Sequence, residues 1–166
     1  MPKPDRLTQK IGALNRREVE ARILAPVVEA MAEAFGRDEV MGILSKTIKE
    51  IARNQGSEMS KLMQGQDAST FAKSLEAWTR DGALDVEVLK KDARTVDFNV
   101  TRCRYAEMYE DLGIPELGRI LSCSRDSALM EGFAPDAKLS RENTILSGAS
   151  HCDFRYRFPT EDADES

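Results

Sequence analysis

The chain contains three cysteines, Cys103, Cys123 and Cys152, and their side chains are the groups most suited to covalent chemistry. A cysteine acts as a nucleophile or a metal ligand in its thiolate form, which needs a positive neighbourhood or a metal ion. Basic residues accompany each cysteine in the sequence: Arg102, Arg104, Arg125, His151 and Arg155. The pattern is compatible with nucleophilic catalysis and equally with three small hydrophobic side chains in the core.

The three thiols and His151 also form a set of soft ligands suited to zinc or iron. Their spacing does not support such a site, because the sequence has no C-x-x-C pair. His151 and Cys152 are also adjacent on a predicted strand and would point to opposite faces. Near a thiol, His151 could instead act as a base or orient another group.

Two carboxylates lie close to cysteines in the sequence. Asp126 follows Cys123 by three residues, and Asp153 follows Cys152 directly. Either carboxylate could donate a proton to a substrate or activate water. The structural alternatives are that Asp126 caps the next helix and that Asp153 forms a surface ion pair with Arg155.

The residues before about Gly82 have the apolar spacing of helices. One predicted helix contains Pro26, ends at Gly36 and repeats an apolar residue every four positions: Val19, Ile23, Val27, Met31 and Phe35. A second helix follows, in which Gly56 predicts a split or a bend. A third begins at Asp67, a good helix cap, and ends near Gly82.

From residue 83 the apolar period changes to two, which is typical of strands. Short helices are predicted between residues 104 and 132. The alternating segments predict strands at 84–88, 96–100, 138–146 and 152–158. We therefore expect an α+β fold, in which an N-terminal helical layer packs on a small antiparallel sheet of about four strands with inserted short helices.

The length of 166 residues, with 41% hydrophobic and 32% charged, fits one globular domain. We expect it to span residues 1–158, with a helical part at 1–82, a sheet part at 83–158 and a disordered acidic tail at 159–166.

The net charge of −5 gives no long-range attraction to nucleic acid. No apolar stretch near the start is long enough for a signal peptide or a membrane span, so we expect a cytoplasmic protein without a membrane partner. The first predicted hairpin and the helix with Met59 and Met63 could face a second copy in a homo-oligomer or belong to the core.

The second half of the chain carries a series of short motifs: R-C-R-Y-A-E-M-Y-E-D-L-G-I-P-E-L-G, L-S-C-S-R-D, G-F-A-P, L-S-R-E-N-T-I-L-S-G and H-C-D-F-R-Y. Over about residues 95–158 the chain thereby resembles the L-2-amino-thiazoline-4-carboxylic acid hydrolase family. The same segment looks like the vinyl-reductase-type small-molecule-binding domain. The family's recurring positions fall on Cys103, Cys123, Asp126, Arg141, Thr144, Gly148, Cys152, Asp153 and Arg155.

The resemblance implies hydrolytic opening of a small cyclic amidine or thioimidate at a C–N or C–S bond, in the named case giving N-carbamoyl-cysteine. A thiolate could attack the C=N carbon, while a carboxylate or His151 transfers protons. A guanidinium could bind the substrate carboxylate in a bidentate geometry. These roles give catalytic candidates (Cys123, Cys152, Asp126, Asp153 and His151) and substrate-binding candidates (Arg141, Arg155, Thr144 and Cys103).

Other mechanisms and functions stay open from the sequence. Water could attack directly, with the cysteines lining the pocket or holding manganese or zinc, although we expect no cofactor to be required. The chain could also be a binding or sensor module for a small molecule without catalysis, or a cysteine-based metal-binding protein. Arg141 has the further alternative of a solvated position at the sheet edge.

Overall fold

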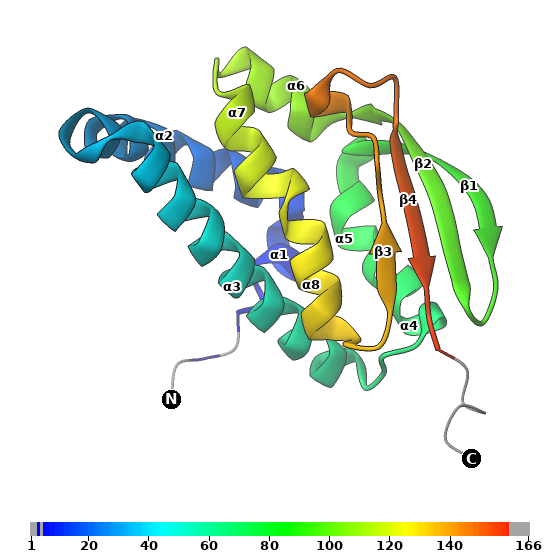
Figure 1. The fold of residues 1–166 in the computed structure, drawn as a ribbon. Helices are drawn as coiled ribbons and strands as arrows, with labels where there is room; N and C mark the ends of the chain where they lie inside the picture. Colours follow the sequence, from blue (N-terminus) through cyan, green and yellow to red (C-terminus); the bar gives the residue numbers. More distant parts are fainter. Residues whose placement is uncertain (1–2, 4, 160–166) are drawn as a thin grey trace.

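The computed structural model describes residue 3 and residues 5–159. Helices cover one side of a four-stranded antiparallel sheet with the strand order β1-β2-β4-β3 (Figure 1). The fold is α+β, which confirms the prediction from the sequence. Beyond Pro159, the predicted acidic tail lies outside the described residues.

The sheet consists of β1 (Leu84–Lys91), β2 (Thr95–Cys103), β3 (Lys138–Ser140) and β4 (Cys152–Arg157). The central pair is β2 and β4, whose register places the Cα atoms of Val100 and Cys152 opposite each other. Side chains of β2 are mostly buried, whereas those of the edge strand β1 are mostly exposed. Cys103 and Cys152 therefore lie at the same end of the sheet.

The strand predicted at residues 138–146 is much shorter than expected and ends at Ser140. The backbone N–H groups of Glu142 and Asn143 donate to the Asp153 carboxylate, at 3.1 and 2.6 Å, and not to a neighbouring strand. The prediction is therefore wrong beyond Ser140, because a side chain takes the hydrogen bonds that would continue the ladder.

The N-terminal helices are α1 (Leu7–Ile11), α2 (Ala13–Phe35) and α3 (Arg37–Met63). As predicted, α2 contains Pro26, and Gly36 separates it from α3 with a φ of 94° that favours glycine. The predicted split at Gly56 is wrong, because α3 continues through this residue.

Gly56 and Gly132 allow α3 to pack directly on α8 (Arg125–Phe133). A Cβ atom at Gly56 would lie 2.0 Å from the carbonyl oxygen of Leu129, and one at Gly132 would lie 1.9 Å from that of Arg53. No other residue type fits this approach without moving a helix. The two glycines therefore fix the position of α8, whose first turn carries Arg125 and Asp126.

The third predicted helix is divided into α4 (Ala68–Ser74), α5 (Glu76–Thr79) and the 3-10 turn η1 (Arg80–Gly82). Asp67 caps α4 as expected, since its carboxylate accepts the N–H of Thr70 at 2.8 Å. The inserted segments are α6 (Arg104–Asp111), α7 (Pro115–Gly118), the π-helical turn η2 (Arg119–Cys123) and the 3-10 turn η3 (Ile145–Ser147).

Two hydrophobic clusters form the core. One joins α2 and α3 to the inserted helices, and the other joins the sheet to α4 and α8. Leu84, Cys103 and Ile145 pack against both clusters. The boundary between the clusters is therefore at the end of the sheet where Cys103 lies.

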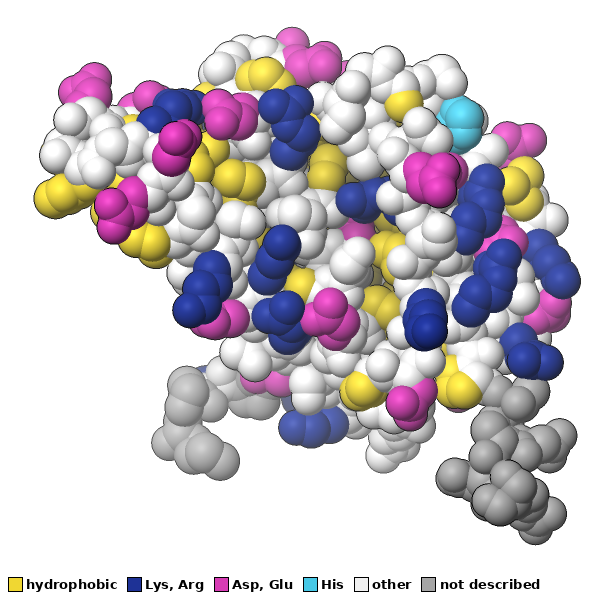
Figure 2. Space-filling model, in the orientation of Figure 1, with side chains coloured by type: hydrophobic (Ala, Val, Ile, Leu, Met, Phe, Trp, Pro, Cys, Tyr) yellow, Lys and Arg dark blue, Asp and Glu magenta, His cyan; other side chains and the backbone are white. Residues whose placement is uncertain are grey.

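Exposed hydrophobic side chains lie on the hairpin of α2 and α3, at the left of the molecule in Figure 2. Those on α2 are Val19, Ile23, Val27, Met31 and Phe35, the residues whose spacing predicts the helix. The buried positions of α2 are instead Ala13, Arg17, Ala21 and Val28. Among the described residues, no helix combines the length and the hydrophobicity needed to cross a membrane.

Candidate functional site

A cavity of about 90 Å³ lies at the boundary between the two core clusters. Strands β2 and β4, helix α8 and the loop after β3 all contribute to its wall. Six of the residues singled out in the sequence line it: Cys103, Cys123, Asp126, Arg141, Thr144 and Cys152. Folding thus brings three widely spaced cysteines to one cavity together with a carboxylate and a guanidinium.

Each thiol reaches the cavity from the end of a secondary-structure element. Cys103 ends β2, and its Sγ accepts the N–H of Ala106 at 3.4 Å, which caps α6. Cys152 begins β4, and its Sγ accepts the N–H of Ile145 at 3.2 Å. Cys123 ends the π-helical turn, and its carbonyl oxygen accepts a hydrogen bond from Arg141 Nη2 at 2.8 Å.

Burial keeps the three thiols protonated. It raises the pKa of Cys103 to about 11 and that of Cys123 to about 12, where the nearby Asp126 carboxylate adds to the effect. Burial also raises the pKa of Cys152, although the N–H of Ile145 and the charge of Arg141 oppose the shift. The arginines near the cavity thus do not create a thiolate in the resting protein.

Asp126 and Arg141 form an ion pair inside the cavity, between Oδ2 and Nη1. Asp126 lies in the first turn of α8, where its charge suits the helix dipole, and Arg141 follows β3 directly. Burial raises the pKa of Asp126, and the charge of Arg141 opposes this. The Arg141 guanidinium also lies 5.3 Å from the centre of the Phe154 ring.

Asp153 is not among the residues that line the cavity, but it shapes the loop that carries two of them. Its carboxylate accepts the backbone N–H groups of Glu142 and Asn143 between Arg141 and Thr144. Partial burial alone would raise the pKa of Asp153, but the N–H of Asn143 and the other hydrogen bonds lower it. The carboxylate is therefore held charged as a loop anchor.

His151 and Arg155 also lie outside the cavity lining. His151 Nδ1 is 2.9 Å from Ser150 Oγ. Arg155 Nη1 donates to the carbonyl oxygen of Phe98 at 3.0 Å, and Nη2 donates to Asn99 Oδ1 at 2.8 Å. Arg155 thus bridges β4 to β2. The sequence-predicted residues divide into a group of six at the cavity and a group of three beside it.

The family comparison covers both groups. The sequence profile of a family described as L-2-amino-thiazoline-4-carboxylic acid hydrolase matches residues 16–156, which is most of the chain. The chain belongs to this family. A comparison with curated proteins gives no match. The family match begins well before the motifs at residues 95–158 and includes most of α2 and all of α3.

Two buried arginines at the cavity of this family member were not predicted as site residues. Arg17 of α2 and Arg125 of α8 line it, and each is 4% exposed. For Arg17, a signal exists in the sequence: it stands four residues from both Ala13 and Ala21, on a helix face of small apolar residues. For Arg125, the signal is its place in the L-S-C-S-R-D motif, two residues after Cys123, but the spacing does not show that it is buried.

Other lining residues missed from the sequence hold the shape of the cavity. They include Trp78, Tyr105 and Ser122. The Tyr105 hydroxyl donates to the Trp78 carbonyl oxygen at 2.9 Å, and Ser122 Oγ lies 2.6 Å from the Tyr109 hydroxyl. Within the described residues, no group of three or more histidine, cysteine or acidic side chains is arranged to hold a metal ion.

Proposed function

We propose that this family member opens a small ring that bears a carboxylate and an electrophilic C=N carbon, such as the L-2-amino-thiazoline-4-carboxylate of the family description. The observation that carries the proposal is the meeting of Asp126, Arg141 and three neutral thiols in one cavity. At about 10–15 Å³ for each water-sized group, the 90 Å³ of this cavity admits a small molecule of roughly six to nine such groups.

We assign proton transfer to Asp126. A carboxyl whose pKa is raised by burial can accept and return a proton more readily near neutral pH than a free aspartate. Arg141 is the positioning residue, because it bonds both the Asp126 carboxylate and the Cys123 carbonyl oxygen. Asp153 supports Arg141 indirectly through the loop.

Water is the nucleophile in the proposed reaction, since the buried thiols stay protonated. Its oxygen bonds to the C=N carbon as Asp126 accepts one of its two protons and passes that proton to the ring nitrogen. The C–S bond then breaks as the added hydroxyl becomes the carbamoyl C=O, and the second proton passes through Asp126 to the leaving thiolate. One water is consumed, and the product carries a carbamoyl group and a free thiol.

The experiment is turnover of L-2-amino-thiazoline-4-carboxylate, followed by mass spectrometry and by assay of the released thiol. We expect Asp126→Asn to lower kcat by at least about 100-fold, the usual contribution of a general acid or base. The control is Asp136→Asn, an exposed residue between α8 and β3, which should keep full activity.

Equal activity of Asp126→Asn and the wild type would remove Asp126 from the reaction. Absence of turnover by the wild type with a panel of thiazolines and cyclic amidines, together with tight binding of a ring carboxylate, would favour a binding module.

A further inference from the structure

We propose that Arg125, supported by Arg17 and Gln55, is the subsite that binds the carboxylate of the ring substrate. The inference rests on the proposed function for the identity of the ligand. It concerns a different part of the cavity from the Asp126–Arg141 pair, and residues that none of the sequence motifs singled out as substrate-binding.

The charges at the cavity are unbalanced. Three of its lining residues are arginines, Arg17, Arg125 and Arg141, whereas Asp126 is its one acidic lining residue among those described. Asp126 pairs with Arg141, and Glu20 pairs with Arg17 at 3.0 Å. Arg125 is left without a carboxylate partner in the described chain.

Arg125 is also incompletely hydrogen-bonded. Its Nη2 donates to Gln55 Oε1 at 2.5 Å, but this partner is a neutral amide. Its Nε is buried and has no acceptor among the described residues. Leaving a buried charged donor unpaired is costly, and a bound anion would offset that cost.

The neighbouring charges add to the demand for an anion. Burial and the positive charge of Arg17 together lower the pKa of Arg125 to about 10, while Glu20 acts in the opposite direction. Arg125 is therefore still protonated at neutral pH, beside a second cation. A carboxylate bound here would interact favourably with both guanidinium groups.

Arg141 is less suited to this task. Its Nη1 and Nη2 are both bonded within the protein, to Asp126 and to the Cys123 carbonyl oxygen. To clamp a substrate carboxylate it would have to release the group that we assign to proton transfer. Arg155, the other arginine expected to bind the carboxylate, bridges β4 and β2 outside the cavity.

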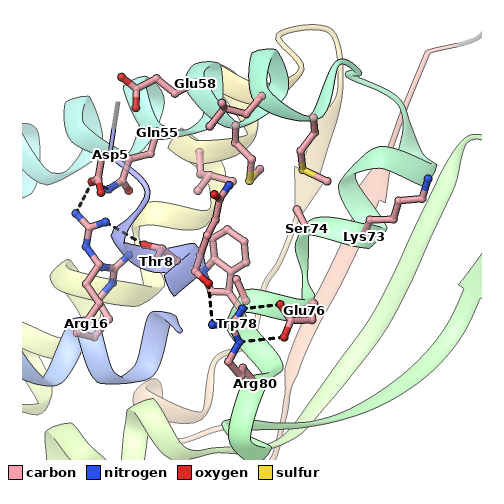
Figure 3. A pocket seen from close by; sticks show the side chains of 17 residues that line it. Asp5, Thr8, Arg16, Gln55, Glu58, Lys73, Ser74, Glu76, Trp78 and Arg80 are labelled. Atoms are coloured by element: carbon pink, nitrogen blue, oxygen red, sulfur yellow. Dashed lines mark hydrogen bonds and ion pairs between the residues drawn. The ribbon is translucent and has the colours of Figure 1, made fainter. Parts of the chain in front are cut away.

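Gln55 determines how Arg125 is presented. It projects from α3, and its Nε2 lies 3.4 Å from Asp5 Oδ2, on the side of a neighbouring cavity where Figure 3 shows Asp5 also facing Arg16. Because Gln55 is neutral, it orients the guanidinium without cancelling its charge. A carboxylate at this position would cancel it.

The test compares binding of thiazolidine-4-carboxylate with binding of its neutral carboxamide, measured by titration calorimetry. We expect the wild type to favour the carboxylate by at least about tenfold, as a charged hydrogen bond inside a cavity requires. Arg125→Gln should abolish this preference and leave carboxamide binding unchanged. Arg22→Gln, at an exposed arginine of α2, is the matched control and should keep the preference.

Gln55→Glu provides a second variant that retains Arg125. The new carboxylate would pair with Arg125, so we expect loss of the carboxylate preference. The subsite is overturned if Arg125→Gln, or Gln55→Glu where the former does not fold, retains the wild-type preference.

The same ligands separate this inference from the proposed function. A preference for the carboxylate that depends on Arg125, without turnover of any ring, would support the subsite and contradict the proposed hydrolysis. Turnover together with a carboxylate preference that does not depend on Arg125 would support the hydrolysis and contradict the subsite.

Discussion

Two cavities lie side by side in this fold, since Arg17, Trp78 and Leu129 line both, and their polar groups differ in one respect. The larger, of about 220 Å³, contains ionic groups that bond to each other: Arg16 pairs with Asp5 at 2.7 Å, and Arg80 pairs with Glu76 at 2.9 Å (Figure 3). The smaller contains Arg125 and Arg141, whose Nε atoms are buried without an acceptor.

The difference indicates that unsatisfied polar groups identify a ligand site better than volume does. A charge that is already paired offers a ligand little, because the ligand must first displace the partner. A buried charged group with an unpaired donor is costly in the empty protein, and a nearby anion offsets that cost. By this criterion we assign the proposed function to the smaller cavity, and matched changes in the two cavities should have unequal effects.

The largest difference is expected between Arg141→Gln and Arg80→Gln. The first leaves Asp126 in the cavity without its ion-pair partner, so we expect kcat to fall by at least about 100-fold and stability to fall by about 2–4 kcal/mol. The second breaks the partly exposed pair with Glu76 and the bond to the Gln9 carbonyl oxygen, so it should leave kcat unchanged and lower stability much less than Arg141→Gln does. Turnover assays and urea denaturation of both variants measure the contrast. Similar losses of kcat and stability in both variants would show that the larger cavity is equally important.

A smaller effect is expected from substitution of the thiols in the smaller cavity. Since burial holds Cys123 protonated, we expect Cys123→Ser to keep kcat within about tenfold of the wild type. Cys103→Ser is the matched control, because its sulfur already accepts the Ala106 N–H. Intact-protein mass spectrometry during turnover should show no adduct. Loss of all activity in Cys123→Ser, with a substrate adduct on the wild type, would establish the thiol as the nucleophile.

The sequence predicts the elements of this fold better than their surfaces. The spacing of Val19, Ile23 and Val27 correctly predicts a helix, but these residues are exposed. Periodicity shows which residues share a face, whereas the packing of α2 on its neighbours determines which face is buried. Similarly, Gly56 taken locally predicts a split or a bend in a helix, whereas the structure shows that it allows α8 to pack closely on α3.

The site was predictable to the extent that its residues belong to motifs. Cys103, Cys123, Asp126, Arg141, Thr144 and Cys152 all line the cavity, although their roles stay predictions. Asp153 and Arg155 belong to the same motifs but bond to backbone groups or to the neighbouring strand. A motif does not distinguish a residue that faces a ligand from one that holds the loop. Arg125 stands in one of the motifs, but its burial could not be predicted, because it depends on a contact with Gln55 of α3 that is remote in sequence.

The smallest effect is expected in the pH dependence of stability. The slope of stability with pH should have opposite signs for a carboxylate in the smaller cavity and one in the larger cavity. Burial raises the pKa of Asp126, so the folded protein holds that proton more tightly than the unfolded chain does. The contribution of Asp126 to the free energy of unfolding should therefore decline as the pH rises. The decline begins at the pKa of a free aspartate, about 3.9, and continues through the higher pKa of the folded state. The hydrogen bond from Arg80 lowers the pKa of Glu76, so its contribution should be lost as the pH falls through its folded pKa.

Denaturation of the wild type, Asp126→Asn and Glu76→Gln across the acid range separates the two contributions. The stability of the wild type relative to Asp126→Asn should fall with increasing pH, while its stability relative to Glu76→Gln should rise. Slopes of the same sign would mean that the charge of Arg141 lowers the pKa of Asp126 more than burial raises it. Asp126 would then be a permanently charged member of a structural ion pair, and its assignment to proton transfer would lose its physical basis.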